Sequence, residues 1–188
     1  CTEGQIGFQG ADEEGPHFSK APQSCPEAAK VGTVEVTSPL LVARDEDHAV
    51  EEDPETGEPV LEALHGAIYL ATPFDNPFGS LVAVYVVIED EVTGIVAKLA
   101  GKGVLDPRTG RLTTYFEDNP QVPLATVKAH VFGGARGAFV TPPACGTHTA
   151  ETRMVPWSAP EGKDAAPESS FATTATPLGG ACPSSEAQ

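Results

Sequence analysis

The chain has 188 residues, with 27 acidic against 11 basic side chains and a formal net charge of −16. This length suits one domain that can bury a hydrophobic core without depending on cross-links. Proteins that bind nucleic acid or anionic lipid surfaces use clusters of Lys and Arg. No such cluster occurs, so we predict neither partner, and because no run of about 18 apolar residues exists we predict no membrane insertion.

Residues 1–30 combine few apolar side chains with many glycines and prolines. They predict an irregular arm that is poor in core residues, with one helical turn at 26–29, where Pro26 suits a first helical position. From Val31 the residues alternate as in a strand, which Pro39 ends or leaves at a sheet edge. The very acidic residues 44–62 predict a long loop or an irregular hairpin tip.

A short strand is expected at 67–71, and residues 81–132 contain four β-rich runs separated by turn signals. The run 81–88 is apolar at both alternating positions, which indicates a central strand covered on both faces or at an interface. Asp106-Pro107-Arg108-Thr109-Gly110 predicts a hairpin turn. In the run before it, Ile95, Ala97 and Leu99 share one face, whereas Lys98 and Lys102 share the other, expected to face solvent.

Residues 147–155 suit an edge strand, 159–169 have the composition of a linker, and 171–176 form a last strand-like piece. The predicted fold is therefore all-β: an antiparallel β-sandwich of about eight to ten strands with long irregular terminal arms. We predict an arm at 1–30, the sandwich core at 31–158, and a linker, last strand and tail at 159–188.

The four cysteines, Cys1, Cys25, Cys145 and Cys182, are widely spaced. No pair has the C-x-x-C spacing of a zinc or redox site. An even count with wide spacing predicts two disulfides in a secreted or cell-surface protein. Three pairings are possible, and we favour Cys1–Cys25 with Cys145–Cys182 because each would cross-link a Gly/Pro-rich segment that has little core of its own.

Motifs for metal, cofactor or catalytic chemistry are missing from the sequence. Carboxylates within 45–62 could bind calcium, but Val50 stands where a calcium loop needs glycine, so the motif does not support calcium. We predict no catalytic, cofactor or metal site, although an enzyme site dispersed over the chain stays open. The histidines lack the spacing of a zinc site: they are His17, His48, His65, His130 and His148. The aromatic residues that could stack on a sugar are few: Trp157, Tyr115, Tyr69 and Tyr85. We expect Trp157 to cover one end of the sandwich.

Several short motifs stand out together: Cys25-Pro26, residues 31–36 and 66–71, Asn76-Pro77-Phe78-Gly79, residues 98–101 and 106–110, and Cys145-Gly146-Thr147. These motifs resemble a Cys-bearing β module of very large secreted bacterial proteins, to which no activity is assigned. The likeness covers most of residues 25–182 and implies a piece of a longer protein. The acidic residues 45–62 lie outside the shared pattern.

The sequence therefore predicts an extracellular structural module without catalysis, which assembles with copies of itself or with neighbouring modules of a larger secreted protein. This prediction rests on the apolar run 81–88, on the arms poor in core residues and on the resemblance. The alternative is a secreted module that binds carbohydrate or calcium, and a third reading is a secreted hydrolase whose site is built from loops.

Overall fold

The computed structural model describes residues 1–90, 93–134, 137–140, 142–175 and 180–182. Two compact units, Cys1–Ala138 and Phe139–Gln188, divide the chain. The prediction of an all-β, antiparallel protein with two disulfides is confirmed, and the bridges are Cys1–Cys25 and Cys145–Cys182. In the described part of the chain, no helix has both the length and the apolar character needed to cross a membrane.

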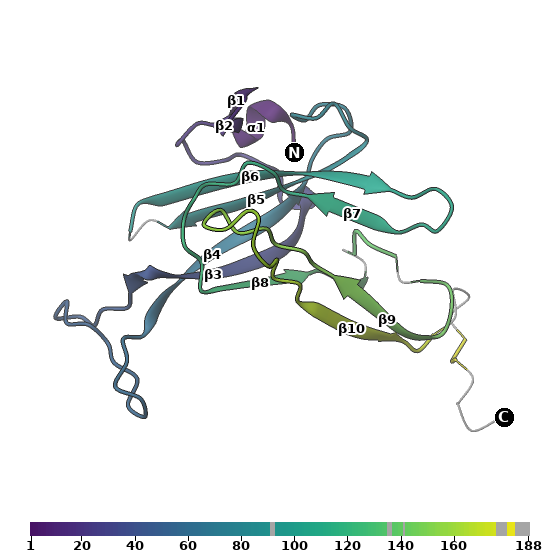
Figure 1. Ribbon diagram of the computed structural model, residues 1–188. Helices are drawn as coiled ribbons and strands as arrows, with labels where there is room; N and C mark the ends of the chain where they lie inside the picture. Colours follow the sequence, from purple (N-terminus) through teal and green to yellow (C-terminus); the bar gives the residue numbers. More distant parts are fainter. Residues whose placement is uncertain (91–92, 135–136, 141, 176–179, 183–188) are drawn as a thin grey trace. The chain divides into compact units, whose positions relative to one another are not determined.

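The first unit is organised around a six-stranded antiparallel sheet (Figure 1). Its strand order is β7-β6-β5-β4-β3-β8, so the chain crosses from one edge to the other between β7 and β8. The elements are α1 (Glu3–Ile6), β1 (Phe8–Asp12), β2 (Gly15–Phe18), a 3₁₀ turn (Glu27–Ala29), β3 (Lys30–Val42), β4 (Leu61–Leu70), β5 (Val82–Asp90), β6 (Ile95–Leu105), β7 (Leu112–Tyr115) and β8 (Thr126–Val131).

The apolar strand β5 lies inside the sheet, between β4 and β6, as its two-sided hydrophobic pattern predicts. Alternate residues of the sheet point to opposite faces. The first face carries Tyr69, Tyr85 and Val87, and the second carries Val34, Leu64 and Ile88. Apolar clusters form on both faces, so β5 contributes to two cores at once.

Residues 1–30, expected as an arm with little core, instead cover part of the first face of the sheet. Ile6 is fully buried there, and Cys1 lies in the same cluster. The rings of Phe8 and Phe18 lie 5.9 Å apart, and Phe18 meets Tyr85 edge-on at 6.3 Å. The layer that packs on the sheet is thus α1 with the two-stranded sheet β1–β2. Its apolar residues are few, but most of them point inward.

Lys98 joins this layer to the sheet and is not solvated as its strand pattern suggested. Only 8% of the residue is exposed, because the N-terminal segment lies over it. Its Nζ donates hydrogen bonds to the carbonyl oxygens of Ile6, Ser19 and Ala21, at 3.0, 3.1 and 2.5 Å. Burial lowers the pKa of this ammonium group, while nearby Glu89 opposes the shift. The three carbonyls match the three donors of the group.

Three hairpin turns of the first unit share the pattern D-x-x-T-G. In each, the aspartate side chain accepts the backbone N–H of the threonine, and the glycine has a φ near 70° that favours glycine. Hydrogen bonds within the turns lower the pKa of the Asp53 and Asp106 carboxyl groups. These two carboxylates therefore stabilise the fold above the ordinary carboxyl pKa, and the stabilisation is lost as pH falls through the lowered pKa. The three turns are 53–57, 90–94 and 106–110. Residues 91–92 of the second turn lie outside the described chain.

The β4–β5 connection is held by the side chain of Asn76, which is buried. Its Nδ2 donates to the carbonyl oxygens of Thr72 and Ser80, at 3.1 and 2.8 Å. Its Oδ1 accepts from the backbone N–H groups of Phe78 and Ser80. All donors and both acceptor positions of the amide are therefore used, which gives the Asn76-Pro77-Phe78-Gly79 motif a structural role.

The second unit is a two-stranded antiparallel sheet closed by the Cys145–Cys182 bridge. Its strands are β9 (Gly146–Glu151) and β10 (Glu168–Thr173). Among its described residues only Thr173 is buried. Large apolar side chains are half or more exposed at Val140, Val155 and Trp157. A two-stranded sheet with so little burial is marginal without further packing.

Replacing Lys98 with methionine is expected to lower the free energy of unfolding by about 2–4 kcal/mol, because one buried and two partly buried carbonyl groups lose their donor. Hydrogen exchange of residues 1–24 should accelerate more than that of β4 and β5. Lys102→Met, on the same strand and face but exposed, is the matched control and should change stability by less than about 0.5 kcal/mol. Equal effects of the two changes would contradict this role for Lys98.

The two buried tyrosines should respond oppositely to removal of the hydroxyl. Tyr85 Oη has no hydrogen-bond partner among the described residues, whereas Tyr69 Oη accepts from Gln23 Nε2 at 3.1 Å. We expect Tyr85→Phe to stabilise the protein by about 1 kcal/mol and Tyr69→Phe to destabilise it by about as much. Urea unfolding measures both changes. A loss of stability in Tyr85→Phe would show that its hydroxyl makes a hydrogen bond.

Candidate functional site

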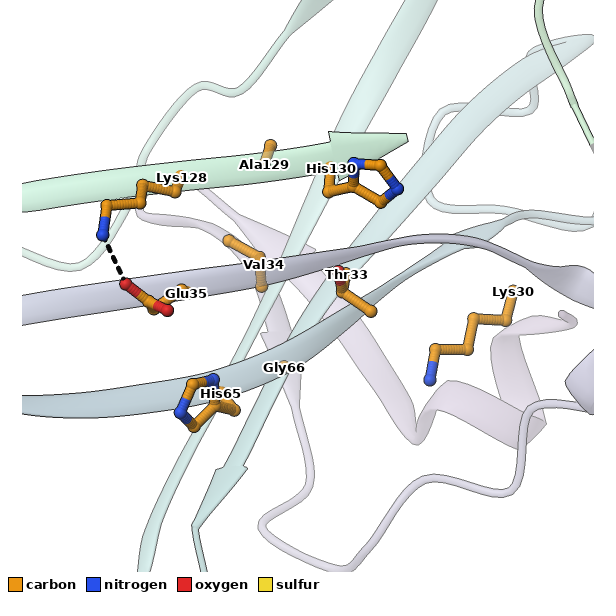
Figure 2. A pocket seen from close by; sticks show the side chains of 9 residues that line it. All are labelled: Lys30, Thr33, Val34, Glu35, His65, Gly66, Lys128, Ala129 and His130. Atoms are coloured by element: carbon orange, nitrogen blue, oxygen red, sulfur yellow. Dashed lines mark hydrogen bonds and ion pairs between the residues drawn. The ribbon is translucent and has the colours of Figure 1, made fainter. Parts of the chain in front are cut away.

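The part of the first face that residues 1–30 leave uncovered contains an open hollow of about 500 Å³. Strands β3, β4 and β8 bring its walls together (Figure 2). Register places Glu35 between His65 on one side and Lys128 on the other, and Thr33 beside His130. We call this cavity the polar hollow. Its polar lining residues are Lys30, Thr33, Glu35, His65, Lys128 and His130.

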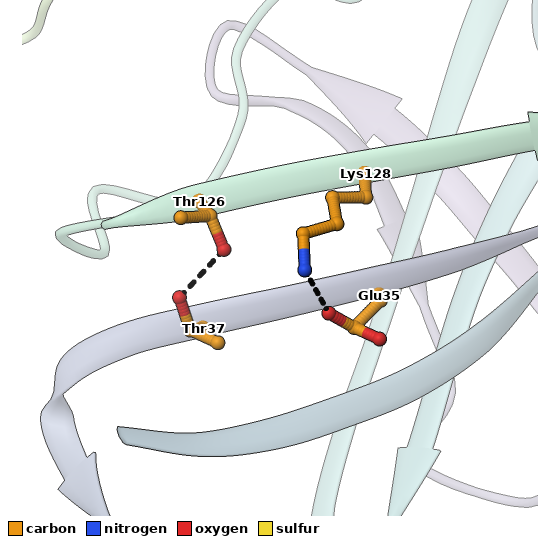
Figure 3. Close-up of polar contacts among 4 residues, drawn as sticks. All are labelled: Glu35, Thr37, Thr126 and Lys128. Carbon is orange, nitrogen blue, oxygen red and sulfur yellow. Dashed lines mark hydrogen bonds and ion pairs between the residues drawn. The ribbon is translucent and has the colours of Figure 1, made fainter. Parts of the chain in front are cut away.

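Two cross-strand contacts join β3 to β8 along this hollow (Figure 3). Lys128 Nζ lies 2.7 Å from Glu35 Oε1, and the hydroxyls of Thr37 and Thr126 lie 2.7 Å apart. The hydrogen bond from Lys128, together with its charge, lowers the pKa of the Glu35 carboxyl. Lys128 therefore leans back over its own sheet, toward β3.

The chemistry that the polar hollow offers is the binding of polar or acidic groups. Within the described chain, neither His65 nor His130 hydrogen-bonds a hydroxyl or a carboxylate, the arrangement expected of a nucleophile and its base. His130 packs its ring against Phe132 at 6.1 Å. No group of three or more His, Cys, Asp or Glu side chains in the described residues is placed to hold a metal ion.

Strand β8 is the outer strand beside the polar hollow, and every residue in it is exposed. The N–H of Phe132 donates to the carbonyl of Val31. This bond shows which residues of β8 direct their backbone groups toward β3 and which direct them away from the sheet. The backbone groups of 126, 128 and 130 consequently face β3, and those of Val127, Ala129 and Val131 point outward. We call this outward row the free edge of β8. The side chains of Val127 and Val131, on the second face, are 47% and 40% exposed.

The acidic segment 44–62 forms two successive tight turns and then the start of β4 (Figure 1). Asp45 Oδ1 accepts from the N–H groups of Asp47 and Ala49, and Asp53 Oδ1 accepts from those of Glu55 and Thr56. These two carboxylates, considered as calcium ligands, thus have a local role in closing the turns. His48 takes a φ of 62° at the tip of the first turn.

Two of the four aromatic residues considered for sugar binding are buried. Tyr69 and Tyr85 are buried in the core of the first unit, where a sugar cannot stack on them. Tyr115 is half-exposed on β7. Trp157, expected to cover one end of a sandwich, is 53% exposed.

His65 and His130 lack zinc-site spacing in the sequence, and no sequence motif joins them to the other residues of the polar hollow. The residues of the polar hollow come from three strands far apart in the chain, so spacing along the sequence could not join them. A usable signal was the alternation within each strand. Polar residues occupy one parity in both β3 and β8: Thr33, Glu35 and Thr37 in the first, and Thr126, Lys128 and His130 in the second.

Removing the amine of Lys128 is expected to raise the pKa of Glu35 toward the ordinary glutamate value. Because the lowered pKa stabilises the fold above that ordinary value and the effect is lost as pH falls, Lys128→Ala should also flatten the acid side of the stability profile. Carboxyl ¹³C NMR titration measures the shift directly. Lys102→Ala is the control and should leave Glu35 unchanged. An unchanged Glu35 titration in Lys128→Ala would contradict the ion pair.

Comparison with known proteins adds no identity to this geometry. No protein-family model, no curated protein and no solved structure matches the chain. The resemblance to large secreted bacterial proteins therefore stays an expectation.

Proposed function

We propose that this chain is an extracellular structural module that assembles through protein–protein contacts and performs no catalysis. The free edge of β8 is the observation that carries the proposal. An edge strand presents unpaired N–H and C=O groups that can bond to another strand. Two disulfides suit an oxidising compartment outside the cytosol.

The usual devices that protect an edge strand are weak in β8. Natural proteins guard edges with proline, with bulges or with an outward lysine. The strand contains no proline. Its only lysine, Lys128, points its amine toward Glu35 on β3, away from the edge. Exposed valines on the second face leave an apolar strip that a neighbouring strand would cover.

The second unit supports the same function by a separate route. It has little buried surface and several exposed large apolar side chains, among them Val140 and Trp157. Contact with a neighbouring module or another copy would supply the packing that its two strands lack. Such exposed apolar side chains are expected in a module that packs against its neighbours in an assembly.

Association of the non-reduced protein should rise with concentration and depend on the free edge of β8. In light scattering and negative-stain microscopy, we expect Val127→Lys to weaken association at least about tenfold, because it places a charge in the apolar strip. Leu40→Lys is the matched control, since Leu40 is an exposed residue of β3 outside the stretch that pairs with β8, and it should associate as the wild type does. A wild-type protein that stays monomeric at millimolar concentration would refute the proposed function.

The second candidate function is ligand binding, which the polar hollow favours by its volume and its imidazole and ammonium donors. Its ligand would be a small polar or acidic molecule, carbohydrate acids included. A thermal-shift screen tests it: above the Kd, a bound ligand raises the melting temperature by a similar increment for each tenfold increase in its concentration. Calcium against a chelator belongs in the same screen.

A further inference from the structure

We propose that copies of this chain associate head to tail, with β8 of one copy pairing antiparallel with β7 of the next. The pairing extends the six-stranded sheet from molecule to molecule. This inference rests on the proposed function and names its interface and its partner, a second copy of the same chain.

Strand direction permits this junction. All neighbouring strands in the order β7-β6-β5-β4-β3-β8 are antiparallel. Because the number of strands is even, the two edge strands run in opposite directions. A copy displaced sideways along the sheet therefore brings its β7 antiparallel to β8 and keeps both faces of the sheet continuous.

The hydrogen-bonding groups of the two edges also match. On β7, the bond from the N–H of Asp106 to the carbonyl of Arg111 sets the alternation, so the backbones of Leu112 and Thr114 point outward. Their side chains lie on the second face, as do those of Val127, Ala129 and Val131 on β8. In an antiparallel sheet, residues that exchange both backbone bonds have side chains on one face. Both edges meet this requirement.

Side-chain chemistry favours the β8–β7 junction over β8–β8 pairing. With Ala129 opposite Thr114, Val131 meets Leu112 on the second face, and Lys128 meets Tyr115 on the first. In the two registers of longest overlap, pairing β8 with a second β8 instead places Lys128 opposite His130 or opposite another Lys128. Juxtaposed basic side chains disfavour that arrangement, whereas apolar cross-strand pairs stabilise a sheet.

A β8–β7 junction uses two different surfaces, so each copy keeps one edge free after pairing. Such heterologous contacts grow into open chains unless the rotation between copies closes a ring. The right-handed twist of a sheet adds a rotation at every junction. The expected product is a twisted fibre with the strands lying across its long axis.

Two proline variants test the junction, each blocking one edge. Ala129→Pro removes an outward N–H of β8, and Thr114→Pro removes an outward N–H of β7, and neither group serves the sheet within one molecule. We expect each variant alone to be monomeric in sedimentation velocity. A one-to-one mixture should form dimers and nothing larger, because one variant retains β7 and the other retains β8.

A pair of charge variants gives the same answer without changing the backbone. Thr113, exposed on the first face of β7, would lie opposite His130 and diagonal to Lys128 of the next copy. Thr113→Glu should strengthen association and Thr113→Lys should weaken it, each by about two- to fivefold at low salt. High salt should shrink the difference.

Other outcomes overturn the junction in identifiable ways. Dimers of Thr114→Pro alone would mean β8–β8 pairing, and dimers of Ala129→Pro alone would mean β7–β7 pairing. If both proline variants assemble as the wild type does, the sheet edges are not the interface, although the proposed function survives through other contacts. A monomeric wild type removes the proposed function together with the junction.

Discussion

The attachment of residues 1–30 to one face of the sheet is the constraint on which the first unit depends. Lys98 holds this segment by three carbonyl oxygens, and the Cys1–Cys25 bridge closes it. A buried ammonium group costs desolvation energy, and only a full set of acceptors offsets that cost. The segment must therefore dock in one position, where Ile6 and Phe18 meet Tyr85 and its neighbours. Directional polar contacts choose that position, and apolar burial supplies the driving force.

Because the N-terminal segment is short, it covers only part of the first face. The rest of that face, over β3, β4 and β8, carries polar side chains and forms the polar hollow. Strand order makes β8 the outer strand beside this hollow, and all of its residues are exposed. The covering layer therefore ends near the strand that we propose as an interface. The ion pair of Lys128 with Glu35 lies at this border and turns the amine of that lysine away from the edge.

Local features of the fold followed from the sequence where a few neighbouring residues decide the conformation. The hairpin at 106–110, the helical turn after Pro26 and the central place of β5 are of this kind. The pairing of the cysteines also followed, because each bridge spans a Gly/Pro-rich segment. Lys98 and residues 1–30 differ from what the sequence predicts, since the pattern of β6 indicates two faces without indicating which one is covered. The compact units, 1–138 and 139–188, likewise emerge from contacts between distant segments.

The sequence by itself determined the β class, the turns and the strong acidity of this protein, because composition and short-range stereochemistry control those properties, and among three possible disulfide pairings it favoured the one found. Tertiary structure alone decided that a segment with few apolar residues becomes a core layer, that a lysine is buried, and that Glu35, His65, Lys128 and His130 share one hollow. It also decided which strands became edges. Strand order brings together residues about 100 positions apart, such as Gly32 and Val131, and no local pattern encodes that order.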